Sequence, residues 1–398
     1  MNSGINRLHK LANSEKRVIL GLMSGTSLDG LDMALCEFNG SGRNTKVNVL
    51  NFHTEPYDKN FQNLIGGVFS KQLVSLEKLC ILNAYIGRTH ANLINKTLSH
   101  WGVLNSEVDL IASHGQTIFH APASYHKIIG MPDATLQIGD SDHIAVGTGI
   151  ITLSDFRQKH IAAGGEGAPL AIYGDYLLFS SPVENRIMLN IGGISNFSFL
   201  PKTLDSHLVF STDTGPGNTL MDAYVRKHFS PKTYDADSLI AKSGTINGSL
   251  LAELLNHPFF REGFPKTTGP ELFNLDYLQK AQEISGTTAI AEADVVATLN
   301  RFSAVSICDA LKICLKDSKD FKIYVSGGGM HNTVLISNIR DIMKGIQLRN
   351  LSELGISPDA KEAVLFAALA NECVTGSSVQ FQNKKTPSVT MGKVSFPA

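Results

Sequence analysis

The chain has 398 residues, with 35 Lys and Arg against 36 Asp and Glu, so its formal net charge is −1. Such a balance provides no field of one sign for a polyanion, which argues against a nucleic-acid partner and favours a small molecule. The longest apolar run, residues 363–370, is far shorter than the roughly 20 residues of a membrane helix. We therefore expect a soluble protein that does not bind a membrane.

The first 15 residues are polar and lack the apolar core of a secretory signal, so we expect a flexible lead-in and no export by that route. The five cysteines are odd in number, and the one close pair lacks nearby His ligands, which predicts reduced, structural thiols. Reduced thiols are typical of the cytoplasm. The length of the chain exceeds the size at which a single core stops growing, so we predict two domains.

Three segments combine an apolar strand with a glycine turn. Residues 17–38 and 187–200 each predict a strand, a polar glycine turn and a second strand. Residues 322–332 predict a strand that enters a triple glycine, followed by a helical stretch to Ile342. Three such elements indicate α/β halves that meet over a ligand.

Strands alternate with helices along the chain. Apolar strands at 108–117 and 207–218 end in polar loops, where α/β sheets usually place ligands. Apolar residues near the 3.6 spacing predict helices over about 74–101, 218–229, 291–316 and 360–375. The C-terminal tail is polar and predicts an irregular or weakly strand-like segment.

Residues 25–32, GTSLDGLD, carry the groups that a nucleotide phosphate needs. The two glycines allow close backbone approach, and the Thr and Ser add hydroxyl donors. The two aspartates could act on Mg²⁺ or its waters. No GxxxxGK[ST] motif is present, so this is not a Walker-type P-loop. One such turn also fits an ordinary hairpin, and only its combination with the turns at 192–196 and 327–329 predicts nucleotide binding.

The three turns together resemble those of the actin, hexokinase and Hsp70 superfamily. The resemblance narrows at GLMSGTSLDGLD, HGQT, QIGD, SDFR, AAGGEGAPL, LNIGGISN, DTGPGN and SGGG, which follow one another over residues 21–329 and resemble the anhydro-N-acetylmuramic acid kinases. It implies an α/β fold of two actin-like (RNase H-like) domains with an interdomain nucleotide and sugar cleft, ATP and Mg²⁺ as cofactors, and a homodimer. The expected domains are 16–150 plus about 361–398, and 151–360, after a lead-in of residues 1–15.

The resemblance also implies an activity in cell-wall recycling. The family uses ATP and water to open a 1,6-anhydro ring and leaves N-acetylmuramic acid 6-phosphate. Because the anhydro bond offers no free hydroxyl, water must add to C1 while a base takes its proton and the γ-phosphoryl group captures O6. The implied ATP-binding residues are Gly25, Thr26, Ser27, Leu28, Asp29, Gly30, Leu31, Asp32, Gly192, Gly193, Gly327, Gly328 and Gly329.

One loop departs from the family pattern. The family has an aspartate, taken as the base, where this chain has His160, and a glutamine where this chain has Glu166. A carboxylate is thus lost at one position and gained at another, and we interpret the two changes as coupled. Neutral imidazole is a competent base near its pKa of about 6.5. We expect His160 to abstract the proton and Glu166 to support it, with the reversed roles also open.

Other candidates follow from the same motifs. Arg157 suits the lactyl carboxylate of the sugar, because a guanidinium binds a carboxylate through two bonds, although an internal salt bridge is equally compatible. Satisfied core polar groups and a helix cap are the alternatives for the rest. The predicted substrate-binding residues are His114, Gln116, Asp155, Arg157, Asp213 and Asn218, and the predicted metal-binding residues are Asp29 and Glu362.

Two other functions stay open on the sequence alone. The chain could phosphorylate a different anhydrosugar, such as levoglucosan, which lacks the acetamido and lactyl groups. It could also be a catalytically impaired sensor of sugar and nucleotide, if the change from aspartate to histidine abolishes the chemistry.

Overall fold

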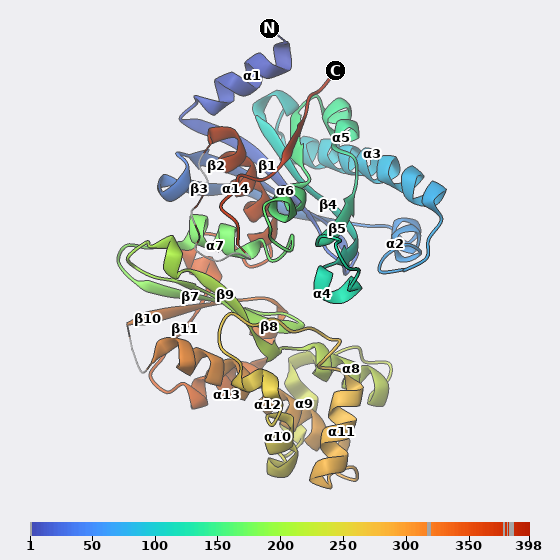
Figure 1. The fold of residues 1–398 in the computed structure, drawn as a ribbon, viewed down its shortest axis with the longest axis vertical. Helices are drawn as coiled ribbons and strands as arrows, with labels where there is room; N and C mark the ends of the chain where they lie inside the picture. Colours follow the sequence, from blue (N-terminus) through green and yellow to red (C-terminus); the bar gives the residue numbers. More distant parts are fainter. Residues whose placement is uncertain (1, 317–319, 377–378, 380, 382–385) are drawn as a thin grey trace. The chain divides into compact units, whose positions relative to one another are not determined.

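The computed structural model describes all residues except 1, 317–319, 377–378, 380 and 382–385 (Figure 1). Its contacts divide the chain into unit 1, Met1–Phe179 with Gly355–Ala398, and unit 2, Ser180–Leu354. The predicted boundaries at 150/151 and 360/361 therefore differ from these units. Residues 151–179 group with unit 1 because the strand at Ile151–Ser154 joins its sheet, and because Asp175 Oδ1 lies 2.8 Å from Lys361 Nζ.

Unit 1 is built on a mixed sheet with the strand order β12-β6-β4-β1-β2-β3, and β5 pairs with β4. Strands β1, β4 and β6 are parallel, while β2 runs antiparallel to both β1 and β3. The strands are β1 (Lys16–Ser24), β2 (Gly30–Asn39), β3 (Lys46–Pro56), β4 (Leu110–Ala121), β5 (Ala134–Ile138), β6 (Ile151–Ser154) and β12 (Lys393–Ser395).

Unit 2 repeats this topology. Its order is β11-β10-β7-β8-β9, in which β7 is parallel to β10 and antiparallel to β8, as β1 is to β4 and β2. The strands are β7 (Asn185–Ile191), β8 (Ile194–Leu200), β9 (Phe210–Pro216), β10 (Phe321–Ser326) and β11 (Leu348–Asn350). The same order and directions of strands thus occur in both units. The chain is therefore a two-domain, actin-like α/β protein, as the motifs predict.

The four predicted long helices are confirmed to within two residues at each end, as α3, α8, α12 and α14. The helices of unit 1 are α1 (Ser3–Ala12), α2 (Lys59–Gly66), α3 (Leu76–Trp101), α4 (Ala123–His126), α5 (Ser141–Thr148), α6 (Phe156–Ala162), α7 (Ala171–Phe179) and α14 (Lys361–Thr375). Those of unit 2 are α8 (Thr219–His228), α9 (Leu239–Ser243), α10 (Gly248–Leu254), α11 (Leu275–Ser285), α12 (Glu292–Leu315) and α13 (Thr333–Ile342).

The N-terminal segment differs from the expected flexible lead-in, because it forms helix α1. The side chain of Asn2 accepts hydrogen bonds from the backbone N–H groups of Gly4 and Ile5, which caps the first turn. The helix contacts α14. Polar composition alone did not reveal this cap.

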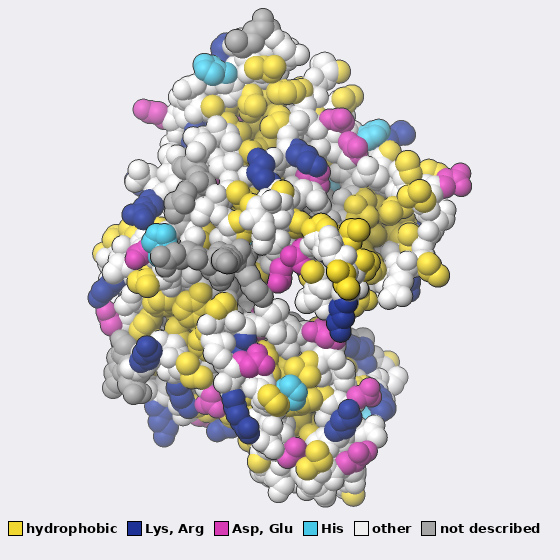
Figure 2. Space-filling model, in the orientation of Figure 1, with side chains coloured by type: hydrophobic (Ala, Val, Ile, Leu, Met, Phe, Trp, Pro, Cys, Tyr) yellow, Lys and Arg dark blue, Asp and Glu magenta, His cyan; other side chains and the backbone are white. Residues whose placement is uncertain are grey.

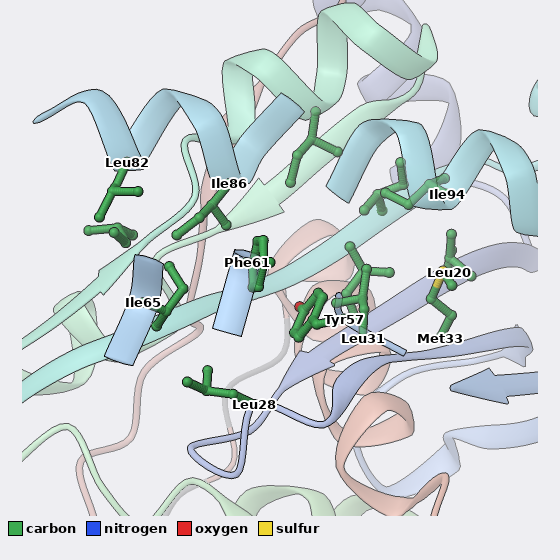
Figure 3. Close-up of a cluster of buried hydrophobic side chains, with 14 of the residues drawn as sticks. Leu20, Leu28, Leu31, Met33, Tyr57, Phe61, Ile65, Leu82, Ile86 and Ile94 are labelled. Carbon is green, nitrogen blue, oxygen red and sulfur yellow. The ribbon is translucent and has the colours of Figure 1, made fainter. Parts of the chain in front are cut away.

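The core of unit 1 lies between its sheet and α3 (Figure 3). Leu82, Ile86 and Ile94 recur at helical spacing along α3 and face the sheet. On β1, Leu20 and Leu22 join this cluster, as period 2 of a strand requires. The apolar face of α3 therefore covers one face of the sheet that carries the turn after β1.

The opposite face of β1 packs closely on α14. Ala363, Ala367 and Ala370 of α14 are fully buried. A Cβ atom on Gly21 of β1 would lie 1.9 Å from the backbone oxygen of Ala363 and 3.0 Å from Cβ of Ala367. Glycine and alanine thus let strand and helix backbones approach each other.

We expect Gly21→Ala to destabilise unit 1 by about 1–3 kcal/mol or more, because the methyl group must push β1 away from α14. Urea unfolding followed by the fluorescence of Trp101, the only tryptophan of the chain, measures this loss. Gly66→Ala is the control, since nothing lies within 4 Å of a Cβ there. Equal stability losses in both variants would contradict the close packing.

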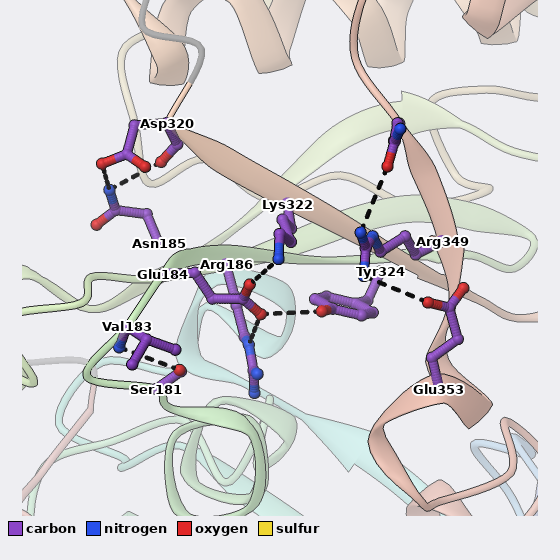
Figure 4. A network of polar contacts seen from close by, with 11 residues as sticks. Ser181, Val183, Glu184, Asn185, Arg186, Asp320, Lys322, Tyr324, Arg349 and Glu353 are labelled. Carbon is purple, nitrogen blue, oxygen red and sulfur yellow. Dashed lines mark hydrogen bonds and ion pairs between the residues drawn. The ribbon is translucent and has the colours of Figure 1, made fainter.

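Unit 2 has its own core and a polar network at its sheet. Ile187 and Leu189 of β7, with Ile323 and Val325 of β10, pack in a cluster with buried residues of α12 and α13. Close to the start of β7, Glu184 binds Lys322, Arg186 and Tyr324 (Figure 4). Burial raises the pKa of Glu184, but these bonds outweigh it and lower the pKa to about 2. The network ties β10 to the residues before β7.

The visible surface mixes acidic and basic side chains without a field of one sign, as the net charge suggests (Figure 2). Among the described residues, no helix combines the length and the apolar character needed to cross a membrane.

Candidate active site

The turn between β1 and β2 exposes the polar groups of GTSLDGLD. Thr26, Ser27 and Asp29 are exposed, whereas the side chains of Leu28 and Leu31 are buried in the core. Ser27 Oγ donates to Asp29 Oδ1 over 2.7 Å. Only the backbone of the two leucines is therefore available to a ligand.

The glycine at position 30 is required by packing. A Cβ on Gly30 would lie 2.6 Å from the backbone oxygen of Glu55 on β3. The backbone N–H of Gly30 is held by Asp29 Oδ1 at 3.1 Å. The described residues offer no hydrogen bond to the backbone N–H groups of Thr26 and Ser27. Such free N–H groups and hydroxyls in a tight turn can bind phosphate oxygens.

Four acidic residues of unit 1 influence one another's charge at or near this turn. The pKa of Asp32 is raised by burial and by Asp29 and Asp359, against a hydrogen bond from Thr54. The pKa of Glu362 is raised by burial and by Asp32, against Lys361 and Arg157. Carboxylates that repel one another in this way suit a divalent cation.

The described residues contain no group of three or more His, Cys, Asp and Glu side chains that could hold a metal by themselves. A cation at Asp29, Asp32 or Glu362 would therefore need ligand phosphates and waters. Mg²⁺ usually binds in this manner.

His160 lies in α6 and is buried, with 1% of its surface exposed. Its Nδ1 accepts a hydrogen bond from the backbone N–H of Gly167 at 3.0 Å, and its Nε2 has no partner among the described residues. Burial and the nearby Arg157 lower its pKa to about 4. A neutral imidazole has one lone-pair nitrogen. Because that nitrogen is bound to Gly167, it is not free to take a proton from water.

Glu166 lies in the loop that His160 holds, one residue before Gly167, and it is half-buried. The pKa of the neighbouring His120 is lowered by burial and by Arg157, and Glu166 opposes this shift. The carboxylate of Glu166 is therefore close enough to His120 to interact with it electrostatically. Of the two candidate bases, Glu166 is the more accessible.

Arg157 connects this loop to β4. Its Nε donates to His114 Nε2 at 3.0 Å, and its Nη1 donates to the carbonyl of Gly167 at 2.7 Å. Gly167 is thus fixed at its N–H by His160 and at its carbonyl by Arg157. The guanidinium has further donors, because these two bonds use only part of its five N–H groups.

His114 is buried against Phe366 of α14, with ring centroids 4.7 Å apart. Burial and Arg157 lower its pKa to about 3. Since its Nε2 accepts from Arg157, the proton of neutral His114 lies on Nδ1. The structure shows that His114 holds Arg157 through this bond, and the sugar contact predicted for His114 stays a prediction.

The sugar contact predicted for Gln116 stays a prediction, and the structure shows which protein groups its side chain binds. Gln116 is fully buried, and its amide binds the residues around the β1–β2 turn: Oε1 accepts from Ser24 Oγ, and Nε2 donates to the carbonyls of Gly25 and Thr117. These bonds use both N–H groups of the amide and one lone pair of its oxygen. Gln116 therefore holds the turn.

Asp155 begins α6 with a left-handed backbone, φ 55°. Its Oδ2 lies 2.7 Å from Lys393 Nζ on the C-terminal strand β12. It lines a cavity of about 660 Å³ together with His114, Gln158 and Lys393. This ion pair lies at the surface, because the side chain of Lys393 is 65% exposed, and the sugar contact predicted for Asp155 stays a prediction.

In unit 2, the turn Gly192–Gly193 after β7 packs on the start of α8. The carbonyl of Gly193 accepts from the N–H groups of Gly217 and Thr219, and that of Gly192 accepts from Asn218. A Cβ on Gly193 would lie 2.4 Å from Thr219 Oγ1. Asn218 stands at the N-cap position of α8, but its side chain makes no capping bond.

The triple glycine after β10 shows two kinds of position. Gly327 has φ 84°, and a Cβ on Gly327 or Gly329 would clash with residues 190–191. Gly328 has open space around its Cα. Packing therefore requires glycine at positions 327 and 329. At Gly328, open space next to the Cα atom leaves room for a ligand.

Asp213 on β9 accepts a hydrogen bond from the backbone N–H of Thr268 at 2.8 Å, and its own N–H donates to the carbonyl of Lys266 at 2.9 Å. Burial raises the pKa of Asp213 to about 6. The negative charge of Glu271 also raises it, and the hydrogen bond from Thr268 lowers it. Asp213 thus anchors the loop 266–268.

Sequence reasoning missed three residues that bind the predicted ones: Ser24, which binds Gln116, Tyr57, which binds the backbone of Asp29, and Lys393, which binds Asp155. Ser24 and Lys393 carried weak signals, one as the polar end of an apolar strand and one as a charge in a polar tail. Tyr57 carried none, because it follows a strand with no motif.

The two-domain actin-like fold, with a hydroxyl-bearing glycine turn in the first unit and glycine turns in the second, is typical of ATP-dependent phosphotransferases, among other ATP-binding proteins. The family profile of anhydro-N-acetylmuramic acid kinase matches residues 17–390. The chain belongs to the anhydro-N-acetylmuramic acid kinase family.

Relatives cover the whole length. The chain is 52% identical to the anhydro-N-acetylmuramic acid kinase of Pseudoalteromonas atlantica, over 100% of both chains. It is 38% identical to that of Caldanaerobacter subterraneus subsp. tengcongensis, over 98% of this chain and 100% of the relative.

The chain also resembles solved structures at low sequence identity. The activator of 2-hydroxyisocaproyl-CoA dehydratase from Clostridium difficile, with bound ADPNP, has a TM-score of 0.40 at 9% identity, covering 90% of this chain and 96% of that chain. Hexokinase from Schistosoma mansoni, complexed with glucose, has a TM-score of 0.35 at 12% identity, covering 89% and 85%. The fold assignment therefore depends on the two strand orders and the family match.

Proposed function

We propose that the chain uses ATP and water to open 1,6-anhydro-N-acetylmuramic acid and releases N-acetylmuramic acid 6-phosphate, with Glu166 as the base. The observation that carries the proposal is the fixed loop around Glu166, which His160 and Arg157 hold from opposite sides of Gly167. It supplies a carboxylate where this chain lacks the aspartate of the family pattern.

In the proposed reaction, the oxygen of water forms a bond to C1 of the sugar and gives its proton to the Glu166 carboxylate. The C1–O6 bond breaks as O6 bonds to the γ-phosphorus of ATP, and the bond from that phosphorus to ADP breaks. The captured phosphoryl group takes the place of a general acid on the leaving oxygen. A positioned base of this kind contributes about 10²- to 10⁴-fold to the rate.

We further propose that Asp29, Asp32 and Glu362 hold Mg²⁺ through its waters, while the exposed turn at Thr26 and Ser27 binds the phosphates. The mutual repulsion of these carboxylates supports the placement. When bound, the ion would neutralise charge on the transferring group. The carboxylates themselves orient its water ligands.

Mass spectrometry after incubation with ATP, Mg²⁺ and the anhydro-amino sugar tests the function. We expect a product heavier than the sugar by one phosphate group and one water. A product with phosphate alone would contradict ring opening. Binding of sugar and nucleotide without any product would identify a sensor instead.

Arg157→Lys tests the sugar that is recognised. We expect kcat/KM for the lactyl sugar to fall about 10²-fold, because lysine cannot bind His114 and Gly167 and also engage a carboxylate through two bonds. The same variant should lose less activity on levoglucosan, which has no carboxylate. Steady-state rates on both sugars measure the difference. Equal losses would reduce Arg157 to a support of the loop.

We also propose a homodimer and a cytoplasmic location. All five cysteines are free, which supports a reducing compartment. Large hydrophobic side chains of unit 1 are exposed, and apolar surface of this kind can mark an interface. They include Leu73, Leu76, Ile128, Ile129 and Met131. Light scattering after gel filtration tests the dimer.

A further inference from the structure

A buried chain of hydrogen bonds crosses unit 1 behind the β1–β2 turn. Ser24 Oγ lies 2.5 Å from Gln116 Oε1 and 2.8 Å from Tyr57 Oη, and Tyr57 Oη lies 2.9 Å from His90 Nε2. All four side chains are buried, and they come from β1, β4, α3 and the residue after β3. These hydrogen bonds therefore join two strands, the residue after a third strand and a helix at one point.

Two backbone carbonyls determine which group donates and which accepts in each of these hydrogen bonds. Gln116 Nε2 donates to the carbonyls of Gly25 and Thr117, each at 3.3 Å, so its Oε1 faces Ser24. An amide oxygen only accepts, and Ser24 must use its single O–H there. Ser24 therefore accepts from the Tyr57 hydroxyl, and the Tyr57 oxygen accepts from His90 Nε2–H.

His90 is held as a neutral donor. Burial lowers its pKa to about 4, and its Nδ1 has no partner among the described residues. An unpaired buried nitrogen costs free energy that an apolar side chain would avoid. The N–H that His90 supplies to Tyr57 is the compensating contact.

Tyr57 holds the turn at both ends. Its hydroxyl binds Ser24 before the turn, and its backbone N–H donates to the carbonyl of Asp29 at 3.1 Å. Its ring stacks on Phe61, with centroids 4.0 Å apart, and belongs to the core cluster next to Leu31 (Figure 3). The exposed Thr26 and Ser27 lie between these two anchored points.

We infer that Tyr57 is a positioning residue for nucleotide binding: oriented by His90, it holds both ends of the β1–β2 turn so that the free N–H groups and hydroxyls at Thr26 and Ser27 are arranged for phosphate oxygens. The inference rests on the proposed role of this turn in binding ATP. The inference assigns a role in nucleotide binding to Tyr57 and His90, which belong to no sequence motif and act without contacting the nucleotide.

Tyr57→Phe removes one oxygen and keeps the ring. We expect the KM for ATP to rise about tenfold, which corresponds to the loss of about one buried hydrogen bond, or roughly 1.4 kcal/mol. The kcat and the KM for the sugar should change by less than about threefold. Tyr277→Phe in unit 2 is the control, because it removes a partly buried hydroxyl that binds the carbonyl of Leu254. It should lower thermal stability without changing the KM for ATP.

Two substitutions of His90 keep the inference testable if Tyr57→Phe does not fold. His90→Gln retains an N–H for Tyr57 and should keep the KM for ATP within about threefold of the wild type. His90→Leu removes it and should raise that KM about as much as Tyr57→Phe. An unchanged KM for ATP in both Tyr57→Phe and His90→Leu would overturn the inference.

Calorimetry of the wild type with ATP and Mg²⁺ separates this failure from failure of the proposed function. Wild-type binding together with unchanged variants would overturn only the role of Tyr57. No wild-type binding would overturn the nucleotide role of the turn, and with it the inference.

Discussion

Glu166→Gln is expected to lower kcat by about 10²- to 10⁴-fold, with the KM values for ATP and sugar changed only a few-fold. The substitution removes the carboxylate that would accept the proton of water but keeps the size and hydrogen-bonding capacity of the side chain. The loop should stay in place, because Gly167 keeps its bonds to His160 and Arg157. Initial rates of ADP release at saturating substrates measure the effect.

Substitutions at His160 distinguish a base from a support. His160→Asn can place Oδ1 near the present Nδ1 and accept from the N–H of Gly167, so we expect kcat within about tenfold of the wild type. His160→Ala leaves that N–H unpaired and should cost more. If His160→Asn loses as much activity as Glu166→Gln, the imidazole is the base and the proposed assignment fails.

A double exchange tests whether the two departures from the family pattern are coupled. His160→Asp combined with Glu166→Gln returns the loop to that pattern and moves the carboxylate back to position 160. We expect at least tenfold more turnover than for Glu166→Gln alone. A double variant as inactive as the single one would show that the rest of this site no longer accepts the original arrangement.

The sequence predicted much of the fold because its signals were local. Apolar spacing located α3, α8, α12 and α14, and glycine turns located the strand ends around them. The boundaries of unit 1 depend on contacts between residues far apart in the chain, such as Asp175 and Lys361, which local patterns do not reveal. Helix α1 escaped because a single cap at Asn2 outweighed a polar composition.

The candidate site was predictable in its residue types but not in its connections. Spacing indicated that Gln116 ends a strand, but not that its amide turns toward the carbonyl of Gly25. Likewise, His160 is chemically a possible base until one bond to Gly167 occupies its lone pair. Such assignments depend on tautomers and side-chain directions, which only the three-dimensional arrangement defines.

Acidification from pH 7 to pH 5 is expected to destabilise unit 1. Burial lowers the pKa of His90 and His160 to about 4 and that of His114 to about 3. The unfolded chain therefore takes up these protons below about pH 6.5, well before the folded unit does. Stability falls as the pH drops from about 6.5 towards 4, by up to about 2 kcal/mol for each histidine at pH 5.

Unit 2 should respond in the opposite direction. Burial raises the pKa of Asp213 and Asp222 to about 6, so the folded unit binds these protons before the unfolded chain does, and its stability rises as the pH falls from about 6 to 4. Because Trp101 lies in unit 1, its fluorescence in urea at the two pH values isolates the loss there, while hydrogen exchange of β7–β10 reports on unit 2. Within unit 1, the raised pKa values of Asp32 and Glu362 oppose the loss from the histidines. A Trp101 transition that does not move between pH 7 and pH 5 would contradict the expected net loss.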